Sequence, residues 1–328
     1  MKTALIFAEK SIPGLFSEKV IDGLRELGEV VLNKGGNSYE ELKATIAGAD
    51  VAVTSWGTPA LTAELLDCAP DLKLVIHAAG SVKPISTDAL WDRGIRVISS
   101  AKPLGEGVAE TALGFTISAS KNYYNLNANI HAGGYREGYE NIRELYELTI
   151  GVIGTGWAGR HYIELLQMFG VDVIAYDPFV DAETLAKLGA KKVELNEVLT
   201  QSDIISIHAP SIPSTHHMIN AETLGMMKKD AILINTARGS IVDEAALYEH
   251  MKNGGLKYAC LDVYDPEPIH ADNPLRTLPN VIMTPHLAGL AANGKRKLGA
   301  HTLYIARKYA NGEPLECEVT KEMLATIA

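Results

Sequence analysis

The chain has 328 residues, 47% of them hydrophobic and 21% charged, which is enough to bury more than one core, so two domains are expected. Its formal net charge of -10 argues against a nucleic-acid or anionic-membrane partner, because such surfaces are bound through clustered Lys and Arg. The three cysteines lie far apart without metal-ligand spacing, which favours a reducing intracellular compartment and predicts no metal site.

The N-terminal part of the chain predicts an α/β domain. The apolar run at residues 4–8 is shorter than the hydrophobic stretch of a signal peptide, so it predicts a first strand and a cytoplasmic protein. A helix with one apolar face is expected around residues 20–27, and further strands at residues 30–32, 51–54, 74–77 and 97–98. This alternation is typical of a mainly parallel sheet with helices on both faces.

A second α/β domain is expected farther along the chain. A long helix from about Glu106 to about Asn129 is followed by a Gly- and Tyr-rich segment, after which strands are predicted at residues 149–153, 172–176, 204–207, 231–234, 257–261 and 281–283. Six strands in this rhythm favour a doubly wound sheet. The longest uncharged segment, residues 204–221, is interrupted by Pro210 and Pro213, so no membrane span is expected.

A glycine loop indicates a nucleotide site in the second domain. Gly154, Gly156 and Gly159 directly follow a predicted strand and open a helix. In that context the glycines permit a tight turn, a close approach of backbone to pyrophosphate, and close packing of helix on strand. The N–H groups and dipole of the helix N-terminus favour the phosphates. A bound FAD, or a turn that binds nothing, remains open on this pattern alone.

An acidic residue predicts which dinucleotide is bound. Asp177 ends the next predicted strand, 18 residues past Gly159, where a carboxylate can accept hydrogen bonds from ribose hydroxyls. The same carboxylate repels a 2′-phosphate, and residues 178–182 include no Arg or Lys to hold one. The sequence therefore predicts NAD as the cofactor.

Two other patterns in the sequence do not indicate a function, and a third pattern is absent. Gly289, Gly294 and Lys295 match the first part of a P-loop, but Arg296 stands where a Ser or Thr must ligate magnesium. The pair His216-His217 lacks the spacing of a metal-binding helix, and no Gly-x-Ser-x-Gly elbow is present, so neither a metal site nor a hydrolase is expected.

Three successive strand ends carry groups suited to catalysis. Arg238, Glu267 and His286 each follow one of the last three predicted strands, and ligands of open α/β sheets bind outside the carboxyl ends of the strands. An Arg binds a carboxylate at two points, and a His beside a carboxylate can give or take a proton. Singly, each residue could be an ordinary loop residue. Together they predict reduction of a 2-oxo acid.

At these residues the sequence resembles the D-isomer-specific 2-hydroxyacid dehydrogenase family. The resemblance rests on the glycine loop, the Asn-Thr-Ala-Arg-Gly segment ending at Gly239, the Asp-Val…Glu-Pro segment from Asp262 to Pro268, and the Pro-His…Gly segment ending at Gly289. It covers nearly the whole chain and is most specific from about residue 100 to residue 290.

The resemblance implies a Rossmann NAD-binding domain (residues 101–297) inserted into a flavodoxin-like substrate domain (residues 1–100 and 298–328). It implies catalytic roles for Arg238, Glu267 and His286, and a hydrogen bond from the nicotinamide carboxamide to Asp262. Further cofactor contacts are expected from Trp157, Ala158, His208, Pro210, Thr215, Thr236, Ala237 and Gly289. A homodimer through the cofactor domain, with residues 123–148 contributing, is also implied.

The substrate side departs from the family pattern. In place of the usual Gly-rich loop with acidic and amide residues the chain has Gly80, Ser81, Val82 and Lys83, whose backbone N–H groups can still hold a carboxylate. Lys83 is either a surface residue or meets a second anionic group. Trp56 either forms a wall of the substrate pocket or packs in the fold.

Alternatives from other functional classes remain. A family relative acts as a transcriptional corepressor, so an NAD(H)-sensing binding protein is one of them. Formate, phosphite or phosphoglycerate could replace the small 2-hydroxy acid as substrate. The chain ends soon after the expected returning helix around residues 297–309, so no extended regulatory domain of the kind found in some serine-pathway relatives is expected.

Overall fold

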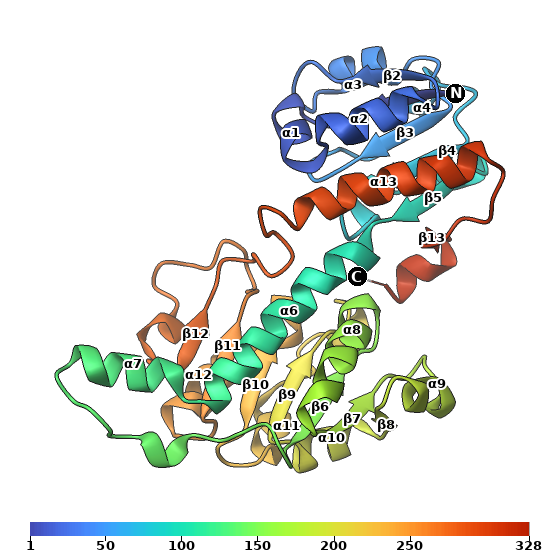
Figure 1. Ribbon diagram of the computed structural model, residues 1–328. Coiled ribbons are helices and arrows are strands. Elements are labelled where there is room, and N and C mark those ends of the chain that lie inside the picture. The colour runs from blue at the N-terminus through green and yellow to red at the C-terminus, as the bar shows by residue number, and fades with distance from the viewer. Residues whose placement is uncertain (328) are drawn as a thin grey trace. The chain divides into compact units, whose positions relative to one another are not determined.

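Two compact α/β units make up the protein. The computed structural model describes residues 1–327, and one unit consists of Met1–Gly105 with Leu290–Ala328, the other of Glu106–Gly289. Figure 1 shows that each unit has its own sheet with helices packed on it. The expected fold class, with a doubly wound cofactor domain inserted into a flavodoxin-like domain, is confirmed.

The sheet of the first unit has the order β13-β5-β4-β3-β1-β2. All its pairings are parallel except the one between β13 and β5. Numbered along the chain, the five parallel strands follow the 2-1-3-4-5 order of flavodoxin-like sheets, whose ligand sites lie at the carboxyl ends of the strands. The strands are β1 (Lys2–Leu5), β2 (Glu29–Leu32), β3 (Val51–Thr54), β4 (Leu74–His77), β5 (Arg96–Ser99) and β13 (Glu318–Val319).

Helices cover both faces of this sheet and bury two apolar clusters. The last long helix of the chain packs against the first two, and Gly299 makes the contact possible, because a Cβ there would lie 2.2 Å from the carbonyl oxygen of Leu15. The helices are α1 (Ile12–Leu15), α2 (Glu18–Arg25), α3 (Tyr39–Ile46), α4 (Ala63–Leu66), α5 (Asp88–Asp92) and α13 (Lys295–Ala310).

The sheet of the second unit has the order β12-β11-β10-β9-β6-β7-β8 and is entirely parallel. The chain runs outward from β6 to β8 and then returns to β9 on the other side of β6, so the topological switch point lies between β6 and β9. The strands are β6 (Thr149–Ile153), β7 (Asp172–Tyr176), β8 (Lys191–Lys192), β9 (Ile204–Ile207), β10 (Ile232–Asn235), β11 (Tyr258–Leu261) and β12 (Val281–Met283).

The long helix expected from about Glu106 to about Asn129 is two helices. The first begins earlier, and a break at Asn122 separates it from the second. Asn122 has φ 57, in the left-handed region, and its side chain donates to Gly138 O (3.0 Å) and accepts from Tyr258 Oη (2.8 Å). The helices are α6 (Ala101–Ser120), α7 (Tyr123–His131), α8 (Trp157–Leu166), α9 (Ala182–Lys187), α10 (Leu195–Gln201), α11 (Ala221–Met226) and α12 (Glu244–Lys252).

Two short strands were not predicted. β8 and β13 have two residues each and lie at sheet edges, and their sequences Lys-Lys and Glu-Val are too short to give an apolar run. The predicted first strand also begins earlier, at Lys2.

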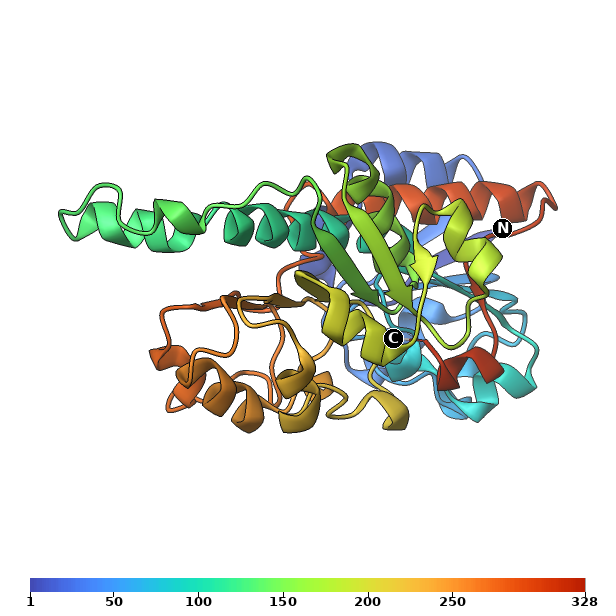
Figure 2. The ribbon, with the colours of Figure 1, turned by 90° about the horizontal axis from the view of Figure 1, so that it is seen from below.

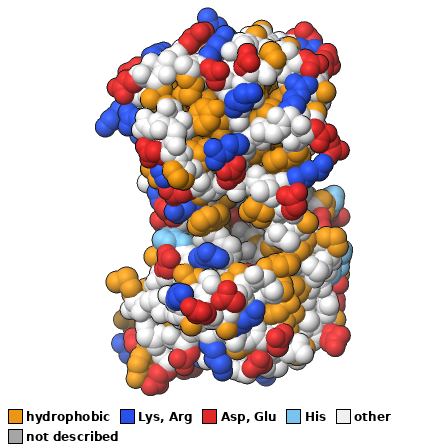
Figure 3. Space-filling model, turned by 90° about the vertical axis from the view of Figure 1, so that its right-hand side faces the viewer, with side chains coloured by type: hydrophobic (Ala, Val, Ile, Leu, Met, Phe, Trp, Pro, Cys, Tyr) orange, Lys and Arg blue, Asp and Glu red, His pale blue; other side chains and the backbone are white. Residues whose placement is uncertain are grey.

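Acidic and basic side chains are mixed on the surface of the protein. Figure 3 shows Lys and Arg interspersed with Asp and Glu on the face it displays. Within residues 1–327, no helix has both the length and the apolar character needed to cross a bilayer.

Candidate active site

The glycine loop lies at the switch point of the second sheet. Gly154 follows β6 with φ +87, and a Cβ there would lie 2.6 Å from the backbone N of Ala209, in the loop after β9. A Cβ at Gly159 would lie 2.2 Å from Gly154 O, whereas one at Gly156 would meet nothing within 4 Å. The first and third glycines are therefore required by packing, and the second faces open space where a pyrophosphate fits.

Asp177 holds the glycine loop from the end of β7. Its Oδ2 accepts from the backbone N and the hydroxyl of Thr155, both at 2.8 Å, and its Oδ1 accepts from Phe179 N at 2.9 Å. Because each carboxylate oxygen can accept more than one hydrogen bond, the carboxylate can still accept hydrogen bonds from ribose hydroxyls. Lys192, which the sequence reasoning did not connect with this site, donates to Val180 O at 2.6 Å.

Two unpartnered polar atoms lie beyond the neighbouring strands. The Nδ1 of His208, after β9, and the Oγ1 of Thr236, after β10, are buried and make no hydrogen bond. Burial lowers the pKa of His208 to about 3, so its ring is neutral at pH 7. Buried polar atoms without partners are rare in folded proteins. A dinucleotide at this edge fits them, together with the open face of Gly156.

The other predicted cofactor contacts lie on the same loops. Trp157 and Ala158 form the first turn of α8, and Pro210 and Ala237 follow β9 and β10. The Thr215 hydroxyl is already engaged, because it donates to Pro210 O at 2.6 Å and accepts from Ile212 N at 3.0 Å. Thr215 therefore shapes the loop after β9. Gly289 ends the second unit, in the loop that follows β12.

A His–carboxylate pair joins the loops after β11 and β12. The Nδ1 of His286 lies 2.6 Å from Oε2 of Glu267, and the two side chains are 46% and 34% exposed. The other carboxylate oxygen of Glu267 accepts from Tyr264 N at 3.0 Å. Because Nδ1 faces the carboxylate, Nε2 is left to exchange a proton with a bound molecule.

Asp262 holds the loop that carries His286. Its backbone carbonyl accepts from His286 N at 2.7 Å, and its carboxylate accepts from Thr284 Oγ1 and from the backbone N of Leu287 and Ala288 at 2.5, 3.0 and 2.8 Å. His286 has φ 53, a conformation that costs a non-glycine residue about 1–2 kcal/mol. The bonds to Asp262 offset this cost and hold the backbone of the loop that carries His286.

Arg238 lies at the adjacent strand end. A Cβ at Gly239 would lie 2.0 Å from the backbone C of Tyr264, so the loop after β10 packs directly on the loop that carries Glu267. Burial lowers the pKa of Arg238, and the nearby charge of Glu267 partly offsets the effect. The half-buried guanidinium is thus partly desolvated, which strengthens its attraction for an anion.

Tyr264 and Thr284 are organising residues that sequence reasoning missed. The Tyr264 hydroxyl lies 3.0 Å from Leu261 O and 2.8 Å from Thr284 O, which links the ends of β11 and β12. Both residues stand one to three positions past a strand, among the predicted site residues. Their position just past a strand is the feature of the sequence that could have identified them.

The predicted substrate residues lie at the carboxyl edge of the first unit's sheet. Gly80, Ser81 and Val82 follow β4, Lys83 begins a short helical turn, and Trp56 follows β3 with 41% of its surface exposed. Val82 is fully buried, with 0% of the residue exposed.

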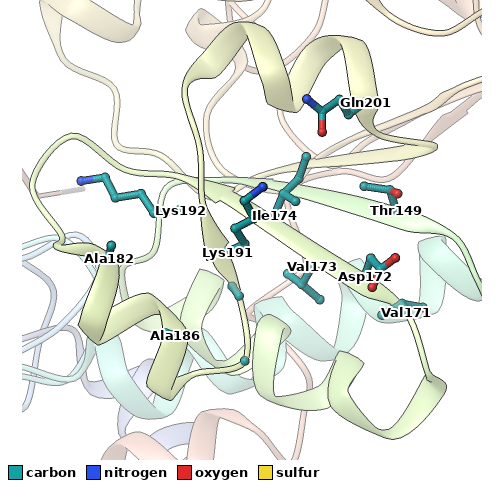
Figure 4. A pocket seen from close by; sticks show the side chains of 12 residues that line it. Thr149, Val171, Asp172, Val173, Ile174, Ala182, Ala186, Lys191, Lys192 and Gln201 are labelled. Atoms are coloured by element: carbon teal, nitrogen blue, oxygen red, sulfur yellow. The ribbon is translucent and has the colours of Figure 1, made fainter.

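A shallow pocket lies at the opposite edge of the second unit's sheet. It has a volume of about 680 Å³ and is lined by the first residues of β6, β7 and β8: Thr149, Asp172 and Lys191 (Figure 4). None of the predicted site residues lines it. Among residues 1–327, no group of three or more His, Cys, Asp or Glu side chains is arranged to hold a metal.

Known proteins share this sequence and fold. Residues 113–288 match the model of the D-isomer specific 2-hydroxyacid dehydrogenase, NAD binding domain. D-3-phosphoglycerate dehydrogenase of Methanocaldococcus jannaschii is 36% identical over 301 residues, 91% of this chain and 57% of that protein. Hydroxypyruvate reductase of Thermotoga maritima is 32% identical over 79% of this chain and 84% of its own length.

A solved structure adds to this likeness. D-lactate dehydrogenase with NAD⁺ from Lactobacillus jensenii superposes with a TM-score of 0.82 at 28% identity, covering 98% of this chain and 100% of that one. The chain spans little more than half the length of the phosphoglycerate dehydrogenases it matches. On the sequence and fold together, it belongs to the D-isomer-specific 2-hydroxyacid dehydrogenase family, and its second unit is the family's NAD-binding domain.

Proposed function

We propose that the protein catalyses the reversible, NAD-dependent reduction of a small 2-oxo acid to the D-2-hydroxy acid. The observation that carries the proposal is the 2.6 Å pair of His286 and Glu267, placed with Arg238 on adjacent strand ends of the sheet whose switch point holds the glycine loop. Bound NADH would supply the hydride. The phosphoglycerate, hydroxypyruvate and glyoxylate enzymes among the relatives support this substrate class.

Each residue has a definite task in this proposal. Arg238 binds the substrate carboxylate and polarises the neighbouring carbonyl, as a guanidinium fork does. His286 gives a proton from Nε2 to the carbonyl oxygen while its carbon receives the hydride, and Glu267 stabilises the charged ring. In the oxidative direction His286 takes the proton back. Asp262 holds the His286 loop, and its contact with the nicotinamide carboxamide remains part of the proposal.

The direct test is NADH oxidation with a panel of acids: glyoxylate, hydroxypyruvate, pyruvate, longer-chain 2-oxo acids and phosphohydroxypyruvate. Turnover of one or more of them supports the proposal. Tight NADH binding without turnover of any acid favours the NAD(H)-sensing alternative. Formate and phosphite, assayed with NAD⁺, separate the remaining family substrates from the 2-hydroxy acids.

The choice of NAD over NADP is proposed to rest on Asp177. Asp177→Ala should weaken NADH binding and narrow the ratio of the NADPH and NADH Kd values by about fivefold, because removing a charge repulsion of about 1 kcal/mol changes that ratio by this factor. The positive charge of Lys192 remains beside this loop in the variant. Kd values for both cofactors are measured by fluorescence titration.

The control for this prediction is Asp172→Ala, which removes an exposed carboxylate at the opposite end of β7. This variant should leave the ratio of the Kd values for NADPH and NADH unchanged. An unaltered ratio in Asp177→Ala would mean that another residue discriminates the ribose.

The proposal includes a cytoplasmic homodimer formed through the cofactor domain. Residues 123–146 expose a group of large apolar side chains: Tyr123, Ile130, Tyr135, Tyr139, Ile142 and Tyr146. Figures 1 and 2 show that α7, within this segment, projects away from the sheet of the second unit. An exposed apolar arm of this kind is typical of a surface covered by a partner.

Charges placed on this arm should separate the dimer. The double variant Tyr135→Asp/Tyr139→Asp changes side chains that are 72% and 63% exposed, and should weaken association by at least about 100-fold if they are buried between subunits. Light scattering coupled to gel filtration measures the mass. Met323→Asp, at an exposed apolar residue of the first unit, is the control and should stay dimeric. A monomeric wild-type protein would contradict the proposal.

A further inference from the structure

One carboxylate bridges the two ends of the loop that carries Glu267. Glu244 is the first residue of α12, in the connection that follows β10. Its Oε1 accepts from the backbone N of Asp265 at 2.9 Å, and its Oε2 accepts from Nδ2 of Asn273 at 2.7 Å. Glu267 lies between these two anchor points. The Glu244 carboxylate therefore closes the loop on both sides of Glu267.

The part of the loop that includes Glu267 has little apolar packing. Residues 265–268 are all exposed. Farther along, Ile269 packs against the neighbouring apolar core, and Arg276 donates to two backbone carbonyls of the loop, at 2.9 and 3.2 Å. An exposed segment with few apolar contacts opens at low cost unless hydrogen bonds hold it. The bonds to Glu244 and to the Glu267 carboxylate therefore set the position of residues 265–268.

Glu244 also belongs to the connection that carries Arg238. From Arg238 the chain passes through the short helical turn Gly239–Ile241 and enters α12 six residues later. Asp243 fixes the start of this helix, because its side chain caps the helix and its backbone N donates to Ile219 O at 2.8 Å. The carboxylate of Glu244 thus couples a rigid helix start to the Glu267 loop.

An acidic residue at the start of a helix has a simpler explanation, which is attraction to the helix dipole. In α12 the capping position is taken by Asp243, and both carboxylate oxygens of Glu244 accept hydrogen bonds from a different loop. Attraction to the dipole alone would make Glu244 matter for the stability of the protein and not for its reaction rate. The two explanations are therefore separated by kinetics.

We propose that Glu244 is a positioning residue, which holds the Glu267 loop so that the Glu267 carboxylate stays in contact with the imidazole of His286. This inference rests on the proposed function and deepens it. The contact between Glu267 Oε2 and His286 Nδ1 is 2.6 Å long, and a hydrogen bond between such groups weakens steeply when its partners move apart. Glu244 acts through Glu267, so its loss affects proton transfer more than binding.

The test is steady-state kinetics of Glu244→Ala with the most active acid of the panel. The variant should lower kcat about tenfold, the usual effect of one lost hydrogen bond to a charged group. KM should change less than about twofold. The Kd of oxalate, which mimics the carboxylate and neighbouring oxygen of a 2-oxo acid, should change equally little. Glu249→Ala removes an exposed carboxylate from the same helix and should keep the wild-type kcat.

An exchange of donor and acceptor tests the bridge itself. Asn273→Asp keeps the oxygen that accepts from Leu275 N at 3.0 Å, but it turns the donor that faces Glu244 into an acceptor. Its kcat should fall as in Glu244→Ala. Adding Glu244→Gln restores both bonds, because the new amide can donate to the new carboxylate while its oxygen accepts from Asp265 N. This double variant should return kcat to within about threefold of wild type.

A second pair of variants shows whether Glu244 acts through Glu267. In the background of Glu267→Gln, Glu244→Ala should lower kcat by less than about twofold more, because the carboxylate that it positions is already gone. A purely structural role would lower kcat by the same factor in both backgrounds, and that result would overturn the inference. Wild-type kcat in Glu244→Ala and Asn273→Asp would overturn it too, while the proposed function stands.

Hydrogen–deuterium exchange gives a readout that does not depend on turnover. The peptide that contains Asp265 and Glu267 should exchange about tenfold faster in Glu244→Ala, and the double variant at positions 244 and 273 should restore the slow rate. If no acid of the panel is reduced, the proposed function fails. Faster exchange then still supports the bridge, and unchanged exchange overturns the bridge as well.

Discussion

Replacing His286 with Asn is expected to lower kcat/KM for the 2-oxo acid by at least about 10²-fold, the usual contribution of a general acid or base. Asn is chosen because it tolerates the left-handed backbone that His286 adopts at φ 53. The Asp262 bonds that hold the loop can therefore persist. The loss then reports the missing proton transfer, and His286→Ala should show at least the same loss.

The measurement is NADH oxidation at saturating cofactor, with the Kd of NADH determined separately and expected to change little. His270→Ala, an exposed histidine three residues past Glu267, is the control and should turn over like wild type. Wild-type-like activity in His286→Asn would remove the proposed acid–base role of His286, and the 2.6 Å pair with Glu267 would then be structural.

Arg238→Ala should also cost at least about 10²-fold in kcat/KM, since removing one group that stabilises the reacting oxygen typically has this effect. Both KM and kcat should be affected, because the guanidinium is proposed to bind the carboxylate and to polarise the carbonyl. Arg238→Lys keeps the charge but loses the planar fork, so it should recover only part of the activity.

Arg25→Ala removes an exposed, ion-paired arginine on α2 of the first unit and serves as the control. It should behave like wild type. If Arg238→Ala binds oxalate and turns over substrate normally, another group holds the carboxylate.

The losses in kcat/KM caused by the His286 and Arg238 substitutions should not be additive. Arg238 and Glu267 interact electrostatically, and Glu267 contacts His286, so the three side chains form one connected group. Residues that act as a unit show strongly non-additive losses. The double variant His286→Asn/Arg238→Ala should therefore have a kcat/KM only slightly below that of the less active single variant.

Much of the site follows from the order of motifs along the chain. In a parallel sheet every strand ends at the same edge, so residues just past successive strands are brought together once the strands are recognised. Recognising the apolar runs before Arg238, Asp262 and His286 was therefore enough to group them. The glycine loop is equally local, because its spacing is dictated by one turn between a strand and a helix.

Other features depend on contacts between distant residues. The break at Asn122 is stabilised by Tyr258, 136 positions away, and no local pattern predicts it. Lys192 reaches the loop after Asp177 only because β8 pairs with β7. β8 itself is too short and too polar to be recognised.

The sequence by itself determined the two α/β domains, the nucleotide loop and the set of groups proposed for chemistry, because strand periodicity and glycine spacing are local properties. Only the tertiary structure decided how those groups are held. The carboxylate of Asp262 supports the His286 loop, and the Ser99 hydroxyl, at the end of β5, donates to Gly80 O in the loop after β4. Such bonds join side chains from separate strands, and their geometry exists only after the sheet has formed.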